Sequence, residues 1–293
     1  MKKDLLAVGV CFTLACSTAA AAGTDALGAA RDLALQLVAE ESHKAAAVEF
    51  RRMALLSEDP AGVGGFFWAA AYEYHAADEH QLAARMLDAC EERSPGLRAE
   101  ALLLRAESAL AEGDDEEAEF YLRSLQSRAG EGDAALYTRL RLARALSGQK
   151  RTSEAISLLE GSAGTCADAV QAIAAYERGR DKTPWVGGVL GAVLPGLGHA
   201  YSGEYANGLR ALLLNALFIY GMVETADAEA WGGFAVISFF ELTWYTGGIY
   251  GGVDAAQRHN RRRMNECLQA IDECAEMKAD LKTVPAVTLT FGF

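Results

Sequence analysis

The sequence predicts an all-α protein, in which a helical solenoid is followed by a small membrane-embedded helical domain and a short extended C-terminal tail. Two observations support this prediction. Between Asp25 and Arg180 the chain is rich in Ala and Leu, nearly free of proline and apolar at helical spacing. Between Trp185 and Val253 it is apolar and Gly-rich with few charges, which suits a lipid bilayer better than an aqueous core. The expected organisation is a signal peptide at 1–22, repeats at 23–180, a membrane-embedded domain at 181–257, and an amphipathic helix with an extended tail at 258–293.

The first 22 residues have the layout of a secretory signal peptide. Lys2 and Lys3 precede an apolar run, which ends in small residues with a cleavage site near Ala22. Lipidation at Cys16 is the alternative, although Thr13 before it fits the usual lipoprotein pattern poorly. The repeats are therefore expected outside the cytoplasm.

Composition excludes some function classes. A net charge of -13 argues against a nucleic-acid partner, because phosphate binding needs clustered Lys and Arg. No Ser/His/Asp, Cys/His or paired-carboxylate motif indicates an enzyme, and no cofactor or metal site is expected. Cleavage would leave four cysteines, and small buried apolar residues are the favoured interpretation. They are Cys90, Cys166, Cys267 and Cys274.

A pair of alanines twelve residues apart recurs four times along the first half. The second alanines of successive pairs are 37, 35 and 37 residues apart. Small residues at fixed positions allow two helices to approach closely. The pairs are Ala34 and Ala46, Ala71 and Ala83, Ala106 and Ala118, and Ala143 and Ala155. The expected result is four helical hairpins.

This arrangement resembles the tetratricopeptide repeat family, most closely in the second unit, where Tyr74 and Pro95 also stand at the family's spacing. The resemblance implies a solenoid whose concave groove binds a protein partner, with residues 167–178 as a capping helix. An irregular helical bundle is the alternative.

Three apolar segments are candidate membrane spans, at 185–202, 205–223 and 231–253. Pro195 interrupts the first, so that it forms either a kinked span or a re-entrant hairpin. Glu241 stands inside the third. A carboxylate there is costly unless it is paired, protonated or facing water, so Glu241 either bonds to Asn215 or His199 for structural reasons or forms a functional site with Asn215.

Charges around these segments give conflicting indications of topology. Arg258, Arg261, Arg262 and Arg263 predict a cytoplasmic C-terminal side, and the acidic loop at 224–229 predicts the opposite side for that turn. Three crossings satisfy both indications and the signal peptide. A two-span hairpin would return the C-terminus to the side of the repeats, with the basic residues bound to lipid headgroups.

The string PGLGHAYSG, the later run FFELTWYTGGIYGG and the repeats before them resemble a family of uncharacterised bacterial envelope proteins. Members join N-terminal tetratricopeptide-like repeats to a PGxGxxYxG membrane hairpin. The motif residues are Pro195, Gly196, Gly198, His199, Tyr201 and Gly203. The resemblance implies membrane residence, and it implies no established activity.

The last residues, VPAVTLTFGF, alternate apolar and polar with a period of two, as in a terminal β-strand. The tail either adds to a partner's sheet or packs on the surface. The function expected from all these features is a non-enzymatic, membrane-anchored scaffold in the bacterial cell envelope, with the inner membrane favoured and the repeats in the periplasm. Its partners would be membrane lipid and a protein. The alternative is a small transporter or channel component using Glu241 and Asn215. Oligomeric state stays open.

Overall fold

The computed structural model describes residues 23–127, 133–160 and 167–278. Within these ranges all regular structure is helical, so the all-α prediction is confirmed. The expected signal peptide, the C-terminal strand and Cys166 lie outside the described residues. The chain divides into two compact units, one made of residues up to 173 together with those from 268 onward, and the other of residues 174–267.

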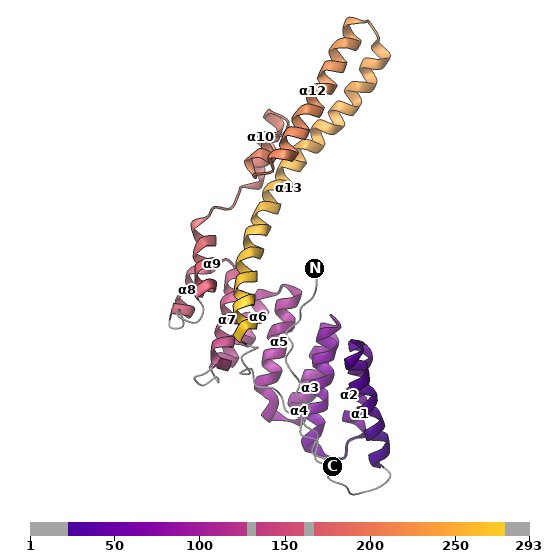
Figure 1. Cartoon of the computed structure of the whole chain (residues 1–293), viewed down its shortest axis with the longest axis vertical. Helices are drawn as coiled ribbons and strands as arrows, with labels where there is room; N and C mark the ends of the chain where they lie inside the picture. Colours follow the sequence, from indigo (N-terminus) through magenta and orange to yellow (C-terminus); the bar gives the residue numbers. More distant parts are fainter. Residues whose placement is uncertain (1–22, 128–132, 161–166, 279–293) are drawn as a thin grey trace. The chain divides into compact units, whose positions relative to one another are not determined.

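The first unit is a series of helical hairpins in which each helix packs against the next (Figure 1). The helices of the four hairpins are α1 (Gly23–Ala39) with α2 (His43–Leu56), α3 (Pro60–Ala76) with α4 (His80–Arg93), α5 (Arg98–Glu112) with α6 (Asp115–Gln126), and α7 (Asp133–Gly148) with α8 (Thr152–Leu159). A short 3-10 helix, η1 (Pro95–Leu97), links α4 to α5, and α9 (Ala167–Arg178) follows the hairpins. Contacts between consecutive helices dominate the unit, so its core is built from neighbours in sequence.

All eight alanines of the sequence repeat are fully buried. Tyr74 is also buried, beside the second pair. A methyl side chain lets two helix axes approach more closely than a larger residue would, which explains why alanine recurs at these positions. Pro95 lies differently from the other repeat positions, because it is exposed and begins η1. Its fixed φ and missing N–H suit the first position of that turn, so it separates two hairpins and does not pack in the core.

The four hairpins share one turn geometry. A residue with left-handed φ follows the first helix of each, at Glu41, Asp78, Gly113 and Lys150, so the sequence spacings of 37, 35 and 37 recur. The next backbone N–H donates to a carbonyl five residues earlier in every case, a bond typical of helix C-termini. The repeat is therefore a property of the backbone, although only the third turn has the glycine that usually marks such a position.

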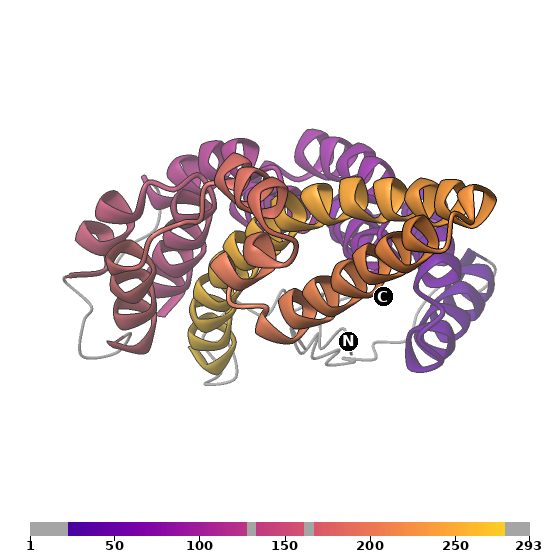
Figure 2. The ribbon, with the colours of Figure 1, turned by 90° about the horizontal axis from the view of Figure 1, so that it is seen from above.

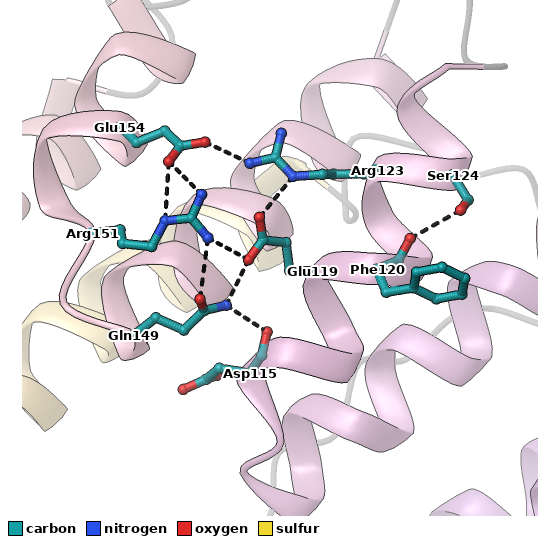
Figure 3. Close-up of polar contacts among 8 residues, drawn as sticks. All are labelled: Asp115, Glu119, Phe120, Arg123, Ser124, Gln149, Arg151 and Glu154. Atoms are coloured by element: carbon teal, nitrogen blue, oxygen red, sulfur yellow. Dashed lines mark hydrogen bonds and ion pairs between the residues drawn. The ribbon is translucent and has the colours of Figure 1, made fainter.

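An ion-pair network joins the third and fourth hairpins (Figure 3). Arg123 lies 2.7 Å from Glu119 and 2.5 Å from Glu154, and Arg151 lies 2.6 Å from Glu119. Phe120 points away from these charges and is exposed. Because both arginines are exposed, water screens these ion pairs and each is expected to contribute little to stability. The network fixes the alignment of neighbouring hairpins more than it stabilises them.

The second unit contains α10 (Pro184–Val193), α11 (Leu197–Tyr201), α12 (Tyr205–Asp227) and the first part of α13 (Trp231–Lys278). Helices α12 and α13 form a hairpin and lie side by side in both views (Figures 1 and 2). The turn between them has left-handed φ at Glu229, and the Ala230 N–H donates to Thr225 O at 2.8 Å.

Two expectations for this region are corrected. The segment 185–202 is not one span, because it breaks into α10 and α11, and ten residues of helix extend only about 15 Å. The third apolar segment does not end near 253 either. It continues as one helix through the boundary expected at 257 to Lys278, because no proline interrupts it.

Candidate functional site

Glycines bring three helices of the second unit into backbone contact. Gly187 on α10, Gly198 on α11 and Gly252 on α13 lie so close together that a Cβ on any of them would be less than 3.0 Å from a backbone atom of another. Backbone atoms cannot rotate away as a side chain can. These positions therefore require glycine, and they hold α10 and α11 against the hairpin.

The break between α10 and α11 depends on two further glycines. Gly196 has a left-handed φ of 91° and packs against Gly208 near the start of α12, again with less than 3.0 Å available for a Cβ. Pro195 stands beside it in the break and is half-buried. Gly203, with φ 83°, forms the turn into α12. The Tyr201 hydroxyl accepts from the Thr183 N–H at 3.1 Å. The predicted motif is thus brought together as a compact turn.

A polar cluster surrounds Glu204, the residue before α12. Its carboxylate accepts from Arg258 Nε at 3.0 Å and Nη2 at 2.9 Å, and from Asn207 at 2.9 Å. His199 Nδ1 lies 3.3 Å away. The hydrogen bonds from Arg258, with those from Asn207 and His199, lower the pKa of Glu204 to about 2 despite partial burial. His199 therefore belongs to this cluster and not to Glu241.

A second set of polar contacts ties the chain before α10 to α13. Arg263 donates to Asp181 at 2.9 Å and to Tyr176 O at 2.6 Å. The Asn260 side chain exchanges two hydrogen bonds with the backbone of Lys182, at 2.7 and 2.8 Å. With Arg258 bound to Glu204, two of the four basic residues after the apolar segment are held inside the unit.

The hairpin above these clusters presents a large apolar surface. Among the described helices, α12 is the one long and apolar enough to cross a membrane, and 11% of its most apolar window is buried. Large apolar side chains on both helices are exposed, and a contiguous apolar surface of this kind marks a lipid or protein contact. They include Leu209, Leu213, Leu217, Ile219, Tyr220 and Val223 on α12, and Val236, Phe239, Phe240, Leu242 and Trp244 on α13.

Three polar side chains inside this hairpin have a buried atom without a hydrogen-bond partner. Asn215 is 2% exposed; its Nδ2 donates to Ala211 O at 2.6 Å, and its Oδ1 is unpaired. Ser238 Oγ and Glu241 Oε2 are also unpaired. The expected hydrogen bond from Glu241 to Asn215 or His199 is therefore absent from the described residues, because Asn215 bonds to its own helix and His199 to Glu204.

The end of α13 belongs to the first unit. The sequence predicted an amphipathic helix in this part of the chain but no contact between it and the repeats. Ile271, Cys274 and Ala275 are buried there. Asp272 lies 2.6 Å from Arg141 Nη1 and 3.1 Å from Arg144 Nε, both on α7. Arg141 and Asp272 are 131 positions apart, so no local sequence pattern indicates their contact. Asp or Arg on an amphipathic helix is ordinarily predicted to face solvent.

Arg141 is the centre of this contact. Its side chain is 10% exposed and donates from Nε to Glu107 on α5 at 2.8 Å, and the Tyr137 hydroxyl donates to the same carboxylate at 3.1 Å. Burial alone would lower the pKa of Arg141, but Glu107, Tyr137 and Asp272 raise it above its usual value. The guanidinium therefore stays charged, and α5, α7 and the end of α13 are joined through it.

The described cysteines are buried, as expected for small apolar residues: they are Cys90, Cys267 and Cys274. Burial raises the pKa of the Cys90 thiol to about 12, which makes it unreactive. The described residues contain no group of His, Cys, Asp or Glu suited to a metal ion.

Across the described ranges the fold is all-helical, and one helix there is long and apolar enough to span a membrane. The chain matches no protein-family model, no curated protein and no solved structure.

Proposed function

We propose that this protein is a membrane-anchored, non-enzymatic scaffold of the bacterial cell envelope, in which tetratricopeptide-like hairpins hold a protein partner in the periplasm and the α12/α13 hairpin anchors them to the inner membrane. The observation that supports it most is the exposed apolar surface of α12. A 23-residue helix is about 35 Å long, enough to cross a hydrocarbon core of about 30 Å. An aqueous protein would bury such a helix.

The path of the chain favours two crossings over three. The chain leaves the first unit near residue 173 and returns to it near residue 268. Because Asp272 contacts Arg141 within that unit, both ends of the intervening segment lie on the same side of any membrane it enters. The number of crossings between them is then even. We therefore set aside the three-crossing arrangement in favour of a hairpin. In it, α12 crosses, as its own length and composition support, and the less apolar run of α13 at 231–253 returns beside it.

Cysteine labelling in spheroplasts tests this arrangement. Single cysteines replacing Glu92 in α4, Gln257 in α13 and Ala228 in the hairpin turn all occupy exposed positions. With a membrane-impermeant maleimide, we expect Glu92→Cys and Gln257→Cys to label in intact spheroplasts, and Ala228→Cys to label only after lysis. The unsubstituted chain gives the background.

Opposite labelling of Glu92→Cys and Gln257→Cys would overturn the hairpin topology. Labelling of all three in intact spheroplasts would overturn insertion. If Glu92→Cys and Gln257→Cys label only after lysis while Ala228→Cys labels in intact spheroplasts, the hairpin topology would stand and the repeats would lie in the cytoplasm.

The unpaired atoms of Asn215, Ser238 and Glu241 support a second candidate, a small transporter or channel component. Polar groups without partners at membrane depth are costly and often mark a path for ions or protons. The two candidates differ in one measurable property, since a scaffold conducts nothing.

We expect proteoliposomes carrying the full chain to dissipate an imposed pH gradient no faster than empty liposomes, as followed by an enclosed pH-sensitive dye. Glu241→Gln, which retains the shape of a neutral carboxyl group, is expected to leave insertion and folding unchanged. Rapid dissipation by the full chain that Glu241→Gln abolishes would favour the transporter. Loss of folded protein on this substitution would instead assign Glu241 a structural role.

A further inference from the structure

We propose that the base of the α12/α13 hairpin binds the phosphate groups of anionic phospholipids through Lys182, Arg210, Arg261 and Arg262. This inference rests on the proposed membrane anchor and names the lipid class that the anchor selects. Arg258 and Arg263 of the basic run already pair with acids inside the unit, which leaves Arg261 and Arg262 for lipid. Lys182, just before α10, and Arg210, on α12, complete the set.

Charge at the hairpin base is unbalanced. Residues 181–210 and 254–263 contain six Lys and Arg against three Asp and Glu, a net charge of +3, whereas the chain as a whole carries -13. The three acids are Asp181, Glu204 and Asp254. Two of them are occupied, Glu204 by Arg258 and Asp181 by Arg263. The remaining acid, Asp254, is shared between Arg258 and Arg261.

Three of the four proposed cations have no ion pair within the described chain, and the fourth, Arg261, shares its acid with Arg258. Arg261 is 3.7 Å from Asp254 and its side chain is 63% exposed. Arg262 is exposed and has no ion pair among the described residues. Arg210 donates only to the neutral Asn207 side chain, at 3.3 Å. The Lys182 ammonium lies 4.7 Å from the centre of the Tyr201 ring and has no ion pair among the described residues.

These cations stand at the depth of a headgroup layer. The contacts of Arg258 with Glu204 and of Asn260 with Lys182 hold the starts of α10 and α12 against the middle of α13 within the unit. Arg210 lies six residues beyond Glu204, about 9 Å along α12, where the exposed leucines begin. Trp185 and Tyr205, 67% and 73% exposed, stand at the same end. Exposed aromatic residues between charge and apolar surface are typical of a membrane interface.

Lipid is the occupant that these positions favour over an acidic protein segment. The cations continue directly into the apolar surface that the anchor buries in the bilayer, so inserting the hairpin brings headgroups within their reach. A guanidinium presents paired donors that match phosphate oxygens. Lipid binding on the side of the repeats also resolves the conflict between the basic run at 258–263 and the expected signal peptide. With an even number of crossings, these arginines lie on the same side as the repeats and need not mark a cytoplasmic face.

Lipid selectivity of the full chain tests the proposal. The chain is reconstituted into phosphatidylcholine bilayers containing trace spin-labelled phosphatidylglycerol or spin-labelled phosphatidylcholine, and the immobilised fraction is measured by electron spin resonance. We expect phosphatidylglycerol to be preferred several-fold, with roughly fivefold as the upper limit for each cation. Arg261→Gln/Arg262→Gln is expected to lower the preference clearly, because only Lys182 and Arg210 of the four cations remain. The control, Arg93→Gln/Arg98→Gln, removes two exposed arginines from the first unit and should leave it unchanged.

Equal immobilisation of both lipids by the unsubstituted chain would overturn the proposal, as would an undiminished preference in Arg261→Gln/Arg262→Gln. Loss of the preference on adding millimolar inorganic phosphate at constant ionic strength would also overturn it, in favour of a site for free phosphate. A chain that fails to enter phosphatidylcholine bilayers at all would show that the anchor itself is wrong.

Discussion

Replacing Gly198 with alanine is expected to prevent the second unit from closing. The added Cβ would lie less than 3.0 Å from the Gly187 carbonyl oxygen and from the Gly252 Cα, and both neighbours are backbone. Forcing extra atoms into a packed site costs about 1–3 kcal/mol where side chains can adjust, and a backbone contact places this substitution at or above the upper end. We expect a loss of at least about 3 kcal/mol in the free energy of unfolding of this unit.

Proteolysis of the detergent-solubilised full chain measures this effect. Gly198→Ala should expose the segment around Lys182, whose backbone Asn260 holds only when the unit is closed. Gly247→Ala is the matched control, because nothing lies within 4 Å of its Cβ and alanine suits a helix interior better than glycine. Equal protease resistance of the two variants would contradict the close backbone packing.

Replacing Arg141 with leucine is expected to destabilise the first unit by about 3–5 kcal/mol, because it leaves Glu107 and Asp272 as partly buried carboxylates without their shared cation. The contact also holds the end of α13 on α7. Urea unfolding should show the loss of stability, and hydrogen exchange should show release of residues 268–276 ahead of the hairpins.

Arg151→Leu provides the comparison, since Arg151 makes as many ion pairs but is 41% exposed, and we expect a much smaller loss of stability than for Arg141→Leu. The triple variant Glu107→Gln/Arg141→Met/Asp272→Asn removes Arg141 together with both of its carboxylate partners, while Arg144 keeps Asp115, and it should recover part of the stability that Arg141→Leu loses. A smaller effect for Arg141→Leu than for Arg151→Leu would show that the buried group does not hold α13.

The repeat illustrates what local pattern can predict. Alanines twelve residues apart indicated paired helices, and the structure buries all eight of them. The turns repeat with the same spacing, but three of the four left-handed positions are Glu41, Asp78 and Lys150. Sequence reasoning could not find these, since such residues carry no turn signature and the neighbouring helices impose the conformation.

The hairpin unit shows the opposite case. The sequence identified Pro195, Gly196 and Gly198 as a motif, but it could not show that Gly187 and Gly252 complete the same contact from helices far apart in the chain. It also offered Asn215 and His199 as partners for Glu241, whereas one bonds to its own helix and the other to Glu204. A hydrogen-bond partner depends on side-chain direction, which spacing along an apolar run does not define.

The sequence by itself determined the helical class of the described residues, the hairpin repeat and the presence, but not the ends, of the apolar helices, because helical periodicity depends on residues three or four apart. Tertiary structure decided where α13 ends, which arginines are free and which are buried, and that the chain returns to its own repeats. Those outcomes depend on contacts such as Asp272 with Arg141, whose charged partners resemble solvent-exposed residues until the fold brings them together.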